Sequence, residues 1–294
     1  MLDNFAYATP EVAQMVLDET GWTKDLLANH SYDAVFHLVT AADGAEDYFT
    51  LANNHARSET PELARMLDKW TQKAWICHQN HFVIDNSQKG FDRKMERLYN
   101  AVAPLVDMKA NPHFVKKYLL ESGLCGFNPE KDIPKEVTTV SHIETLDYLV
   151  SDDAHVEKWL KERIELHDVD EERKHDENKQ TCCYSWSYIE RHMAEKYSER
   201  MELRRKLNEN VYKDLLKRKD VRRNTVVKKL TTFIENNICF MIEQYDFDNK
   251  EISVLRVQTD TADLKQTTLI PPWLKIEKDI SEDQTYFQGN LTYK

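Results

Sequence analysis

The sequence predicts an α+β protein with two parts, and three observations indicate this division. Between 1 and 108, short apolar segments at 33–39 and 81–85 alternate with helix-like patterns, which is typical of a parallel sheet. From 137 to 294, apolar and polar residues alternate with the period of a β-strand. The interval 109–136 carries several prolines and glycines, so we expect a linker there.

Local signals place the helices of the first part. Thr9 before Pro10 and Thr60 before Pro61 are each an N-cap residue followed by a first-turn proline. Gly21 ends the first of these helices, because glycine readily takes the left-handed conformation of a helix terminus. A further helix is expected over 91–106.

The second part is expected to be an antiparallel β-domain. Strands are predicted near 140–149, at 201–207, around 233–242 and at 252–257, with a helix at 208–219. The segment 156–164 fits a helix or a strand equally well, and periodicity alone does not separate the two. The highly charged segment 167–180 is expected to be an exposed hairpin extension.

Composition narrows the functional classes. The chain has 294 residues and a formal net charge of −11, so no domain-wide basic field for nucleic acid is expected. No apolar run approaches the roughly 20 residues of a membrane span, and no secretory signal precedes the first helix. The five cysteines show no metal-ligand spacing, which favours reduced thiols and a cytoplasmic location.

Three stretches together carry a resemblance to a known family. They read FHLVTAADGAEDYFTLANNHARSETPELARMLDKWTQKAW at 36–75, HFVIDNSQKGFDRKM at 81–95 and WLKIEKDISEDQTYFQGNLTY at 273–293. The chain resembles proteins of the TRPL translocation defect type. These join a P-loop kinase-like AAA domain, related to the kinase part of NadR, to a CYTH-like antiparallel β-tunnel.

The resemblance implies a regulatory protein that binds GTP with Mg²⁺ or an anionic phospholipid such as phosphatidic acid. It also implies a cytoplasmic protein that associates with a membrane surface or with a larger assembly. In this reading, 1–108 is the C-terminal part of the P-loop domain and 137–294 is the CYTH-like domain.

One departure from the family concerns phosphoryl transfer. The family's phosphate loop ends in Gly-Lys-Ser/Thr, and its backbone N–H groups and lysine hold the phosphates. These 294 residues contain no Gly-Lys dipeptide. We therefore expect a chain that either begins downstream of the loop or has lost catalysis, and we expect no phosphoryl transfer by the chain as given.

The resemblance assigns a nucleotide site in the first part. Arg57, Arg65 and Lys69 match the lid that closes over phosphates, and Asn86 matches a loop that contacts the purine. An ordinary solvated helix face is the alternative for the three cations. Asp43 to Asp47 and the pair His78 and His81 fit polar turns and structural hydrogen bonds better than a metal site.

A second set of charged residues is expected to line the β-tunnel. Cations there would bind phosphate oxygens and acids would hold a divalent ion, whereas a half-exposed solvent face is the alternative. The full Glu-x-Glu-x-Lys signature of catalytic CYTH relatives is missing from the expected first strand, which offers only Glu144 and Asp147. The candidates are Lys161, Arg163, Glu202, Arg204, Lys206, Lys228, Lys229, Glu243, Arg256 and Asp279.

The sequence thus leads to one main hypothesis and two alternatives. The main one is regulatory binding of nucleotide or phospholipid without catalysis. The first alternative is a structural subunit of a larger assembly, and the second is a CYTH-type protein that binds or hydrolyses triphosphates in the tunnel.

Overall fold

The computed structural model divides the chain into two compact units. Unit 1 comprises 1–114, 233–239 and 258–269, and unit 2 comprises the remaining residues. The described residues are 2–29, 32–50, 59–78, 80–87, 90–106, 114–121, 127–166, 184–192, 201–247, 250–259 and 270–286, with 288, 289 and 292.

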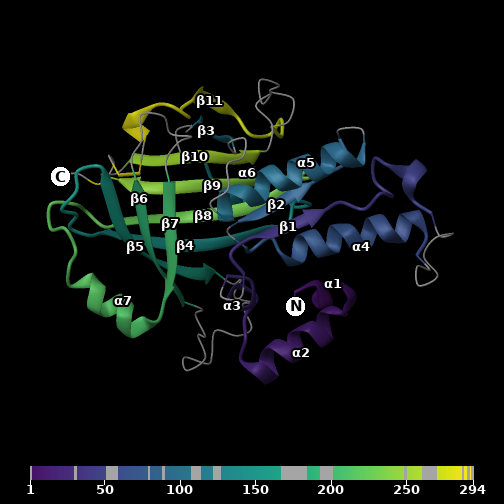
Figure 1. Ribbon diagram of the computed structural model, residues 1–294, viewed down its shortest axis with the longest axis horizontal. Coiled ribbons are helices and arrows are strands. Elements are labelled where there is room, and N and C mark those ends of the chain that lie inside the picture. The colour runs from purple at the N-terminus through teal and green to yellow at the C-terminus, as the bar shows by residue number, and fades with distance from the viewer. Residues whose placement is uncertain are drawn as a thin grey trace. The chain divides into compact units, whose positions relative to one another are not determined.

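Unit 1 contains a two-stranded parallel sheet and several helices (Figure 1). The pairing of β1 with β2 confirms the predicted parallel strands, and Phe36 stacks on Phe82 with ring centroids 5.1 Å apart. The elements before and after are α1 (Asp3–Tyr7), α2 (Pro10–Thr20), α3 (Lys24–Asn29), β1 (Val35–Leu38), η1 (Glu46–Tyr48), α4 (Pro61–Ala74), β2 (His81–Ile84), α5 (Phe91–Val102) and η2 (Ala103–Val106).

The predicted helix ends of unit 1 are confirmed. The hydroxyls of Thr9 and Thr60 accept hydrogen bonds from the third residue of their helices, at 3.4 and 3.2 Å. Gly21 ends α2 with a φ of +66°, which a residue with a Cβ atom rarely adopts. These ends follow from local sequence because each depends on neighbouring residues alone.

Unit 2 is dominated by a nine-stranded sheet in the order β11-β3-β10-β9-β8-β4-β5-β6-β7 (Figure 1). The pairs β4–β5, β5–β6, β6–β7, β9–β10 and β3–β11 are antiparallel, as predicted. The elements are β3 (Phe114–Leu120), α6 (Pro129–Asp132), β4 (Thr139–Tyr148), β5 (Val156–Leu166), β6 (Tyr184–His192), β7 (Met201–Leu207), α7 (Glu209–Leu216), β8 (Val226–Glu235), β9 (Ile238–Phe247), β10 (Lys250–Thr259), β11 (Ile276–Asp279) and η6 (Gln284–Tyr286).

The prediction of a linker at 109–136 is wrong. The interval 109–136 contains β3, which lies between β10 and β11 in the sheet, and the short helix α6. The prolines and glycines that flank β3 dominate the composition of this interval and conceal its seven-residue strand. The ambiguous segment 156–164 is strand β5. The expected hairpin at 167–180 lies outside the described residues.

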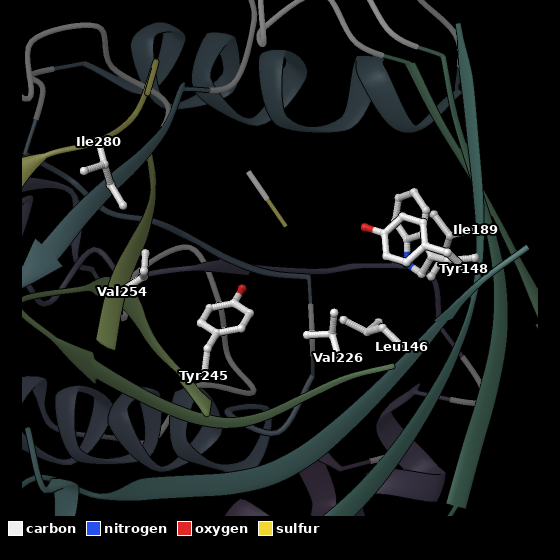
Figure 2. Packing of buried hydrophobic residues seen from close by; sticks show 8 residues of the cluster. Leu146, Tyr148, Ile189, Val226, Tyr245, Val254 and Ile280 are labelled. Atoms are coloured by element: carbon white, nitrogen blue, oxygen red, sulfur yellow. The ribbon is translucent and has the colours of Figure 1, made fainter. Parts of the chain in front are cut away.

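The nine-stranded sheet has two faces with different contents. Figure 2 shows Tyr148, Tyr245 and Val254, from three different strands, with side chains directed toward a common interior. We call this the interior face. On the exterior face, Leu149, Leu160 and α7 residue Tyr212 form a second buried cluster. The full interior apolar cluster is Leu146, Tyr148, Trp159, Ile189, Val226, Tyr245, Val254 and Ile280.

Candidate anion-binding site

Charged residues continue the interior face beyond its apolar cluster. Because alternate residues of a strand share a face, Glu144 lies on the same face as Leu146, and Lys161 on the same face as Trp159. The same spacing places Lys228 with Val226, Glu243 with Tyr245, and Arg256 with Val254. The interior face therefore changes from apolar to charged along five neighbouring strands.

Two buried carboxylates join these strands into an ion-pair ladder. Lys161 Nζ lies 3.3 Å from Glu144 Oε1, and Lys228 Nζ lies 3.3 Å from Glu144 Oε2. Lys228 Nζ also lies 3.1 Å from Glu243 Oε1, while the Tyr245 hydroxyl donates to Glu243 Oε2 at 2.6 Å. We call Lys161, Glu144, Lys228 and Glu243 the ladder. All four are less than 9% exposed.

Arg163, two residues after Lys161 on β5, extends the ladder along the interior face. Its guanidinium Nε lies 3.9 Å from Glu144 Oε1, and its Nη2 lies 3.0 Å from His142 Nδ1. The side chain is 2% exposed, and it is the largest fully buried side chain in the described part of the chain. An arginine cannot lose its proton in a protein, so this position holds a permanent buried positive charge.

The charges perturb one another strongly. Burial alone would raise the pKa of both carboxyls, but the neighbouring lysines hold the pKa of Glu144 well below its usual value and lower that of Glu243 to about 2. Burial lowers the pKa of Lys161 to about 7, despite the attraction of Glu144. The pKa of Lys228 is raised instead, because its attraction to Glu243 and Glu144 outweighs burial. Both carboxylates therefore remain ionised at neutral pH.

Further cations lie close enough to act on this ladder. Lys117 of β3 and Arg256 of β10 lower the pKa of Glu243, and Arg204 of β7 lowers the pKa of Lys161. Lys117 is two residues from Leu119, which packs on the interior apolar cluster, so it shares the interior face. The described side chains of this band thus bring six cations, Lys117, Lys161, Arg163, Arg204, Lys228 and Arg256, to two carboxylates, Glu144 and Glu243.

Six of the ten predicted tunnel residues come together in this band. They are Lys161, Arg163, Arg204, Lys228, Glu243 and Arg256. Lys206 is exposed and shares the face of Arg204, because it pairs in register with the buried interior residue Ser187. Glu202 pairs in register with Arg191, but its side chain lies outside the described part of the chain.

The other two predicted tunnel residues lie elsewhere. Lys229 follows Lys228 directly and faces the exterior of the sheet. Asp279 of β11 is half-exposed and lies 3.8 Å from Lys116 Nζ, on the face opposite Lys117. Neither residue joins the ladder.

Sequence reasoning missed four members of the site. His142 and Glu144 lie in the predicted strand near 140–149, where Glu144 is part of an incomplete signature, and Tyr245 of β9 lies beyond the predicted strand around 233–242. Lys117 lies in β3, which was expected to be linker. The available signal was the alternation of each residue with buried apolar neighbours, although this pattern does not show which face closes into an interior.

The predicted nucleotide site in unit 1 has different surroundings. Arg57 lies outside the described residues, and Lys69 is exposed on α4. Arg65 Nε donates to the carbonyl of Ala42 at 2.6 Å. Asn86 Nδ2 donates to the carbonyls of Thr40 and Asp43 at 2.9 and 2.7 Å. Arg65 and Asn86 therefore tie the loop after β1 to α4 and to the loop after β2.

Among the described residues, no group of three or more His, Cys, Asp or Glu side chains is arranged to hold a metal ion. No helix in the described ranges is long and apolar enough to cross a membrane.

Comparisons with known proteins give distant structural likenesses only. No protein-family model and no curated protein matches the chain. The inorganic triphosphatase NE1496 is 15% identical with a TM-score of 0.37, over 63% of this chain and 96% of that one. The PH1012 protein from Pyrococcus horikoshii OT3 is 14% identical with a TM-score of 0.31, over 51% and 80%.

A chain of the Schizosaccharomyces pombe Mediator head module is 16% identical with a TM-score of 0.31, over 54% of this chain and 87% of that one. At these TM-scores the likenesses carry no argument about function. The α+β class with a dominant antiparallel sheet is confirmed by the strand pairings themselves. Nothing in the described residues supports the P-loop kinase-like assignment of the first part.

Proposed function

We propose that unit 2 binds an oligophosphate anion, such as tripolyphosphate or the phosphate chain of a nucleoside triphosphate, on its interior face. The observation that carries this proposal is the gathering of six cations around two carboxylates among the described side chains of one band of the sheet. Phosphate oxygens accept strong charge-assisted hydrogen bonds from lysine and arginine, which suits such a band.

The burial of these charges supports the same function. Removing a charge from water is costly unless an opposite charge or hydrogen-bonding partners compensate it. Lys161, Arg163 and Lys228 are each at most 7% exposed, and Glu144 and Glu243 lie beside them. A polyanion bound on the interior face would add further opposite charge and would stabilise the fold on binding.

The site supports binding of a triphosphate better than its hydrolysis. Catalytic CYTH relatives carry two glutamates before a lysine on their first strand. The residue two before Lys117 in β3 is Val115, and the residue four before it in the sequence is His113. The regulatory reading with GTP or phospholipid rests on unit 1 residues whose described members hold loops together. It is the weaker candidate.

A matched pair of variants tests the proposal. Arg204 and Arg205 are neighbours on β7, and alternation places Arg204 on the interior face and Arg205 on the exterior face. Calorimetric titration of the full chain with tripolyphosphate should show about tenfold weaker binding in Arg204→Gln than in wild type, for loss of one charge-assisted contact. Arg205→Gln should bind as wild type does.

Two outcomes would reject the proposal. One is no heat or mobility change with tripolyphosphate at millimolar concentration. The other is an equal loss of affinity in both variants, which would indicate a general surface-charge effect. A chain that fails to bind but sediments with a large assembly from its own cells would favour the structural-subunit alternative.

A further inference from the structure

The ladder bears on how the proposed anion would be held. Triphosphate sites of the CYTH type are expected to use acids that bind a divalent metal, so the residues present can be tested against that expectation. Glu144 and Glu243 are the two carboxylates of the central interior band among the described side chains. Together they offer four carboxylate oxygens.

Each of the four oxygens already has a donor. Oε1 and Oε2 of Glu144 lie 3.3 Å from Lys161 Nζ and from Lys228 Nζ respectively. Oε1 of Glu243 lies 3.1 Å from Lys228 Nζ, and its Oε2 accepts the Tyr245 hydroxyl at 2.6 Å. A divalent ion would have to displace ammonium groups that are buried with the carboxylates.

Lys161 and Lys228 would also repel a metal ion. A metal ion within coordination distance of Glu144 would lie close to two ammonium groups and near the Arg163 guanidinium. Like charges at such separations, in a medium less polar than water, repel strongly. Mg²⁺ also requires near-octahedral oxygen ligands, and Val115 supplies none from the interior face of β3. The described side chains of this band therefore do not fit a divalent metal.

We infer that this site holds its oligophosphate directly by lysine and arginine side chains, without a bridging divalent metal. The inference rests on the proposed function. The described side chains of the band place six cations on the interior face. The magnesium complex of pyrophosphate or triphosphate carries less negative charge than the uncomplexed anion, so the uncomplexed anion is the preferred ligand of these cations.

The experiment is a pair of titrations of the full chain with tripolyphosphate, one in EDTA and one in millimolar MgCl₂. The inference predicts binding in EDTA that is as tight as in MgCl₂ or tighter, because Mg²⁺ neutralises the ligand and competes for it. Binding that requires Mg²⁺ would overturn the inference and leave the proposed function intact. No binding under either condition would overturn the proposed function itself.

A variant gives an independent readout. In a metal-bridged site, Glu144→Gln would remove a metal ligand and weaken binding. In a site built on direct contacts, it would release Lys161 and Lys228 from their shared partner, so binding in EDTA should tighten several-fold. Circular dichroism and the midpoint of thermal unfolding would establish that this variant is folded. Weaker binding by a folded Glu144→Gln chain would contradict the inference.

Discussion

Both units contain partly or fully buried polar side chains, and in unit 1, beside ion pairs such as Arg97 with Asp85, several of these side chains bond the main chain. In unit 1, Asn86 and Lys94 donate to main-chain carbonyls after β1, and the carboxylate of Asp68 accepts from the main-chain N–H of Thr40. In the ladder of unit 2, ionised side chains meet other ionised side chains. The main-chain partners of unit 1 fix the position of loops.

The two kinds of partner have different implications for function. A side chain that bonds the main chain has a permanent partner, and its removal is felt as lost rigidity or stability. In the interior band, the described side chains bring six cations to two carboxylates, and these ionised groups shift one another's pKa values. Buried polar groups of the first kind indicate structure, whereas a cluster of the second kind is a candidate ligand site.

The largest expected effect tests whether the ladder also holds unit 2 together. Lys228→Met removes the ammonium that lies against both carboxylates and leaves two buried negative charges with less compensation. Loss of one partner of a buried ion pair costs about 3–5 kcal/mol of unfolding free energy. Urea denaturation, followed by hydrogen exchange in peptides from β8 and β9, would measure this loss.

Lys217→Met is the control for that variant. Lys217 forms an exposed ion pair with Asp214 at 2.7 Å, and both side chains are about three-quarters exposed. Its removal should leave the denaturation midpoint unchanged, since exposed pairs contribute little. Equal effects of the two variants would mean that burial makes no difference between these ion pairs.

The second expected effect is a pH dependence in unit 1. Burial, with a smaller contribution from His37 and His78, lowers the pKa of His81 to about 3 from an ordinary 6.5. The unfolded chain binds a proton at His81 more readily than the folded chain does. The unfolding free energy is therefore at its full value above pH 6.5, and it declines as the pH falls toward 3. The slope is about 1.4 kcal/mol per pH unit, so about 2 kcal/mol is lost at pH 5.

His81→Leu provides the comparison. Neither ring nitrogen of His81 has a hydrogen-bond partner within the described residues, so leucine loses no bond there. Denaturation curves of the two chains at pH 7 and pH 5 should differ mainly at pH 5, where the variant retains more stability. Parallel behaviour of both chains would show that His81 does not titrate on unfolding.

The smallest expected effect tests whether Lys161, whose pKa is lowered, contributes its charge to anion binding. Lys161 faces Glu144, Arg163, Arg204 and Lys228, and its pKa is about 7. It is charged below that pH and becomes neutral above it, so it should contribute less to anion binding at pH 8 than at pH 6. The affinity should fall by at most about tenfold, because the protonated fraction of Lys161 falls about tenfold between pH 6 and pH 8.

Lys161→Arg separates this effect from ionisation of the ligand, because arginine keeps its charge at both pH values. The ratio of affinities of the wild-type and variant chains for tripolyphosphate should fall between pH 6 and pH 8. A constant ratio would mean that Lys161 keeps its proton over this range or does not contact the anion.

The sequence predicted what depends on neighbouring residues. Thr60 and Pro61 begin α4, and the apolar segments around Phe36 and Phe82 form parallel strands, because caps and short buried strands have local signals. The strand β3 escaped prediction, since Lys116 and Lys117 interrupt its apolar pattern and breaking residues surround it.

The site could be predicted only in part. Alternation along one strand placed Arg204 and Lys206 on one face. Lys228 and Lys229 were both predicted to line the tunnel, although neighbours on a strand face opposite sides. Which of those faces becomes interior depends on pairing between distant strands. The contact of Lys228 with Glu144 joins residues from β8 and β4, and no local pattern encodes it.

The arrangement of unit 1 along the chain has a consequence for synthesis. The turn at Asn236 and Asn237, both with positive φ, belongs to unit 1, and Asn237 accepts a hydrogen bond from Gln72 at 3.1 Å. A ribosome makes the first 114 residues long before this turn and the segment 258–269. Nascent unit 1 must therefore wait for most of the chain, and its folding cannot run strictly from the N-terminus onward.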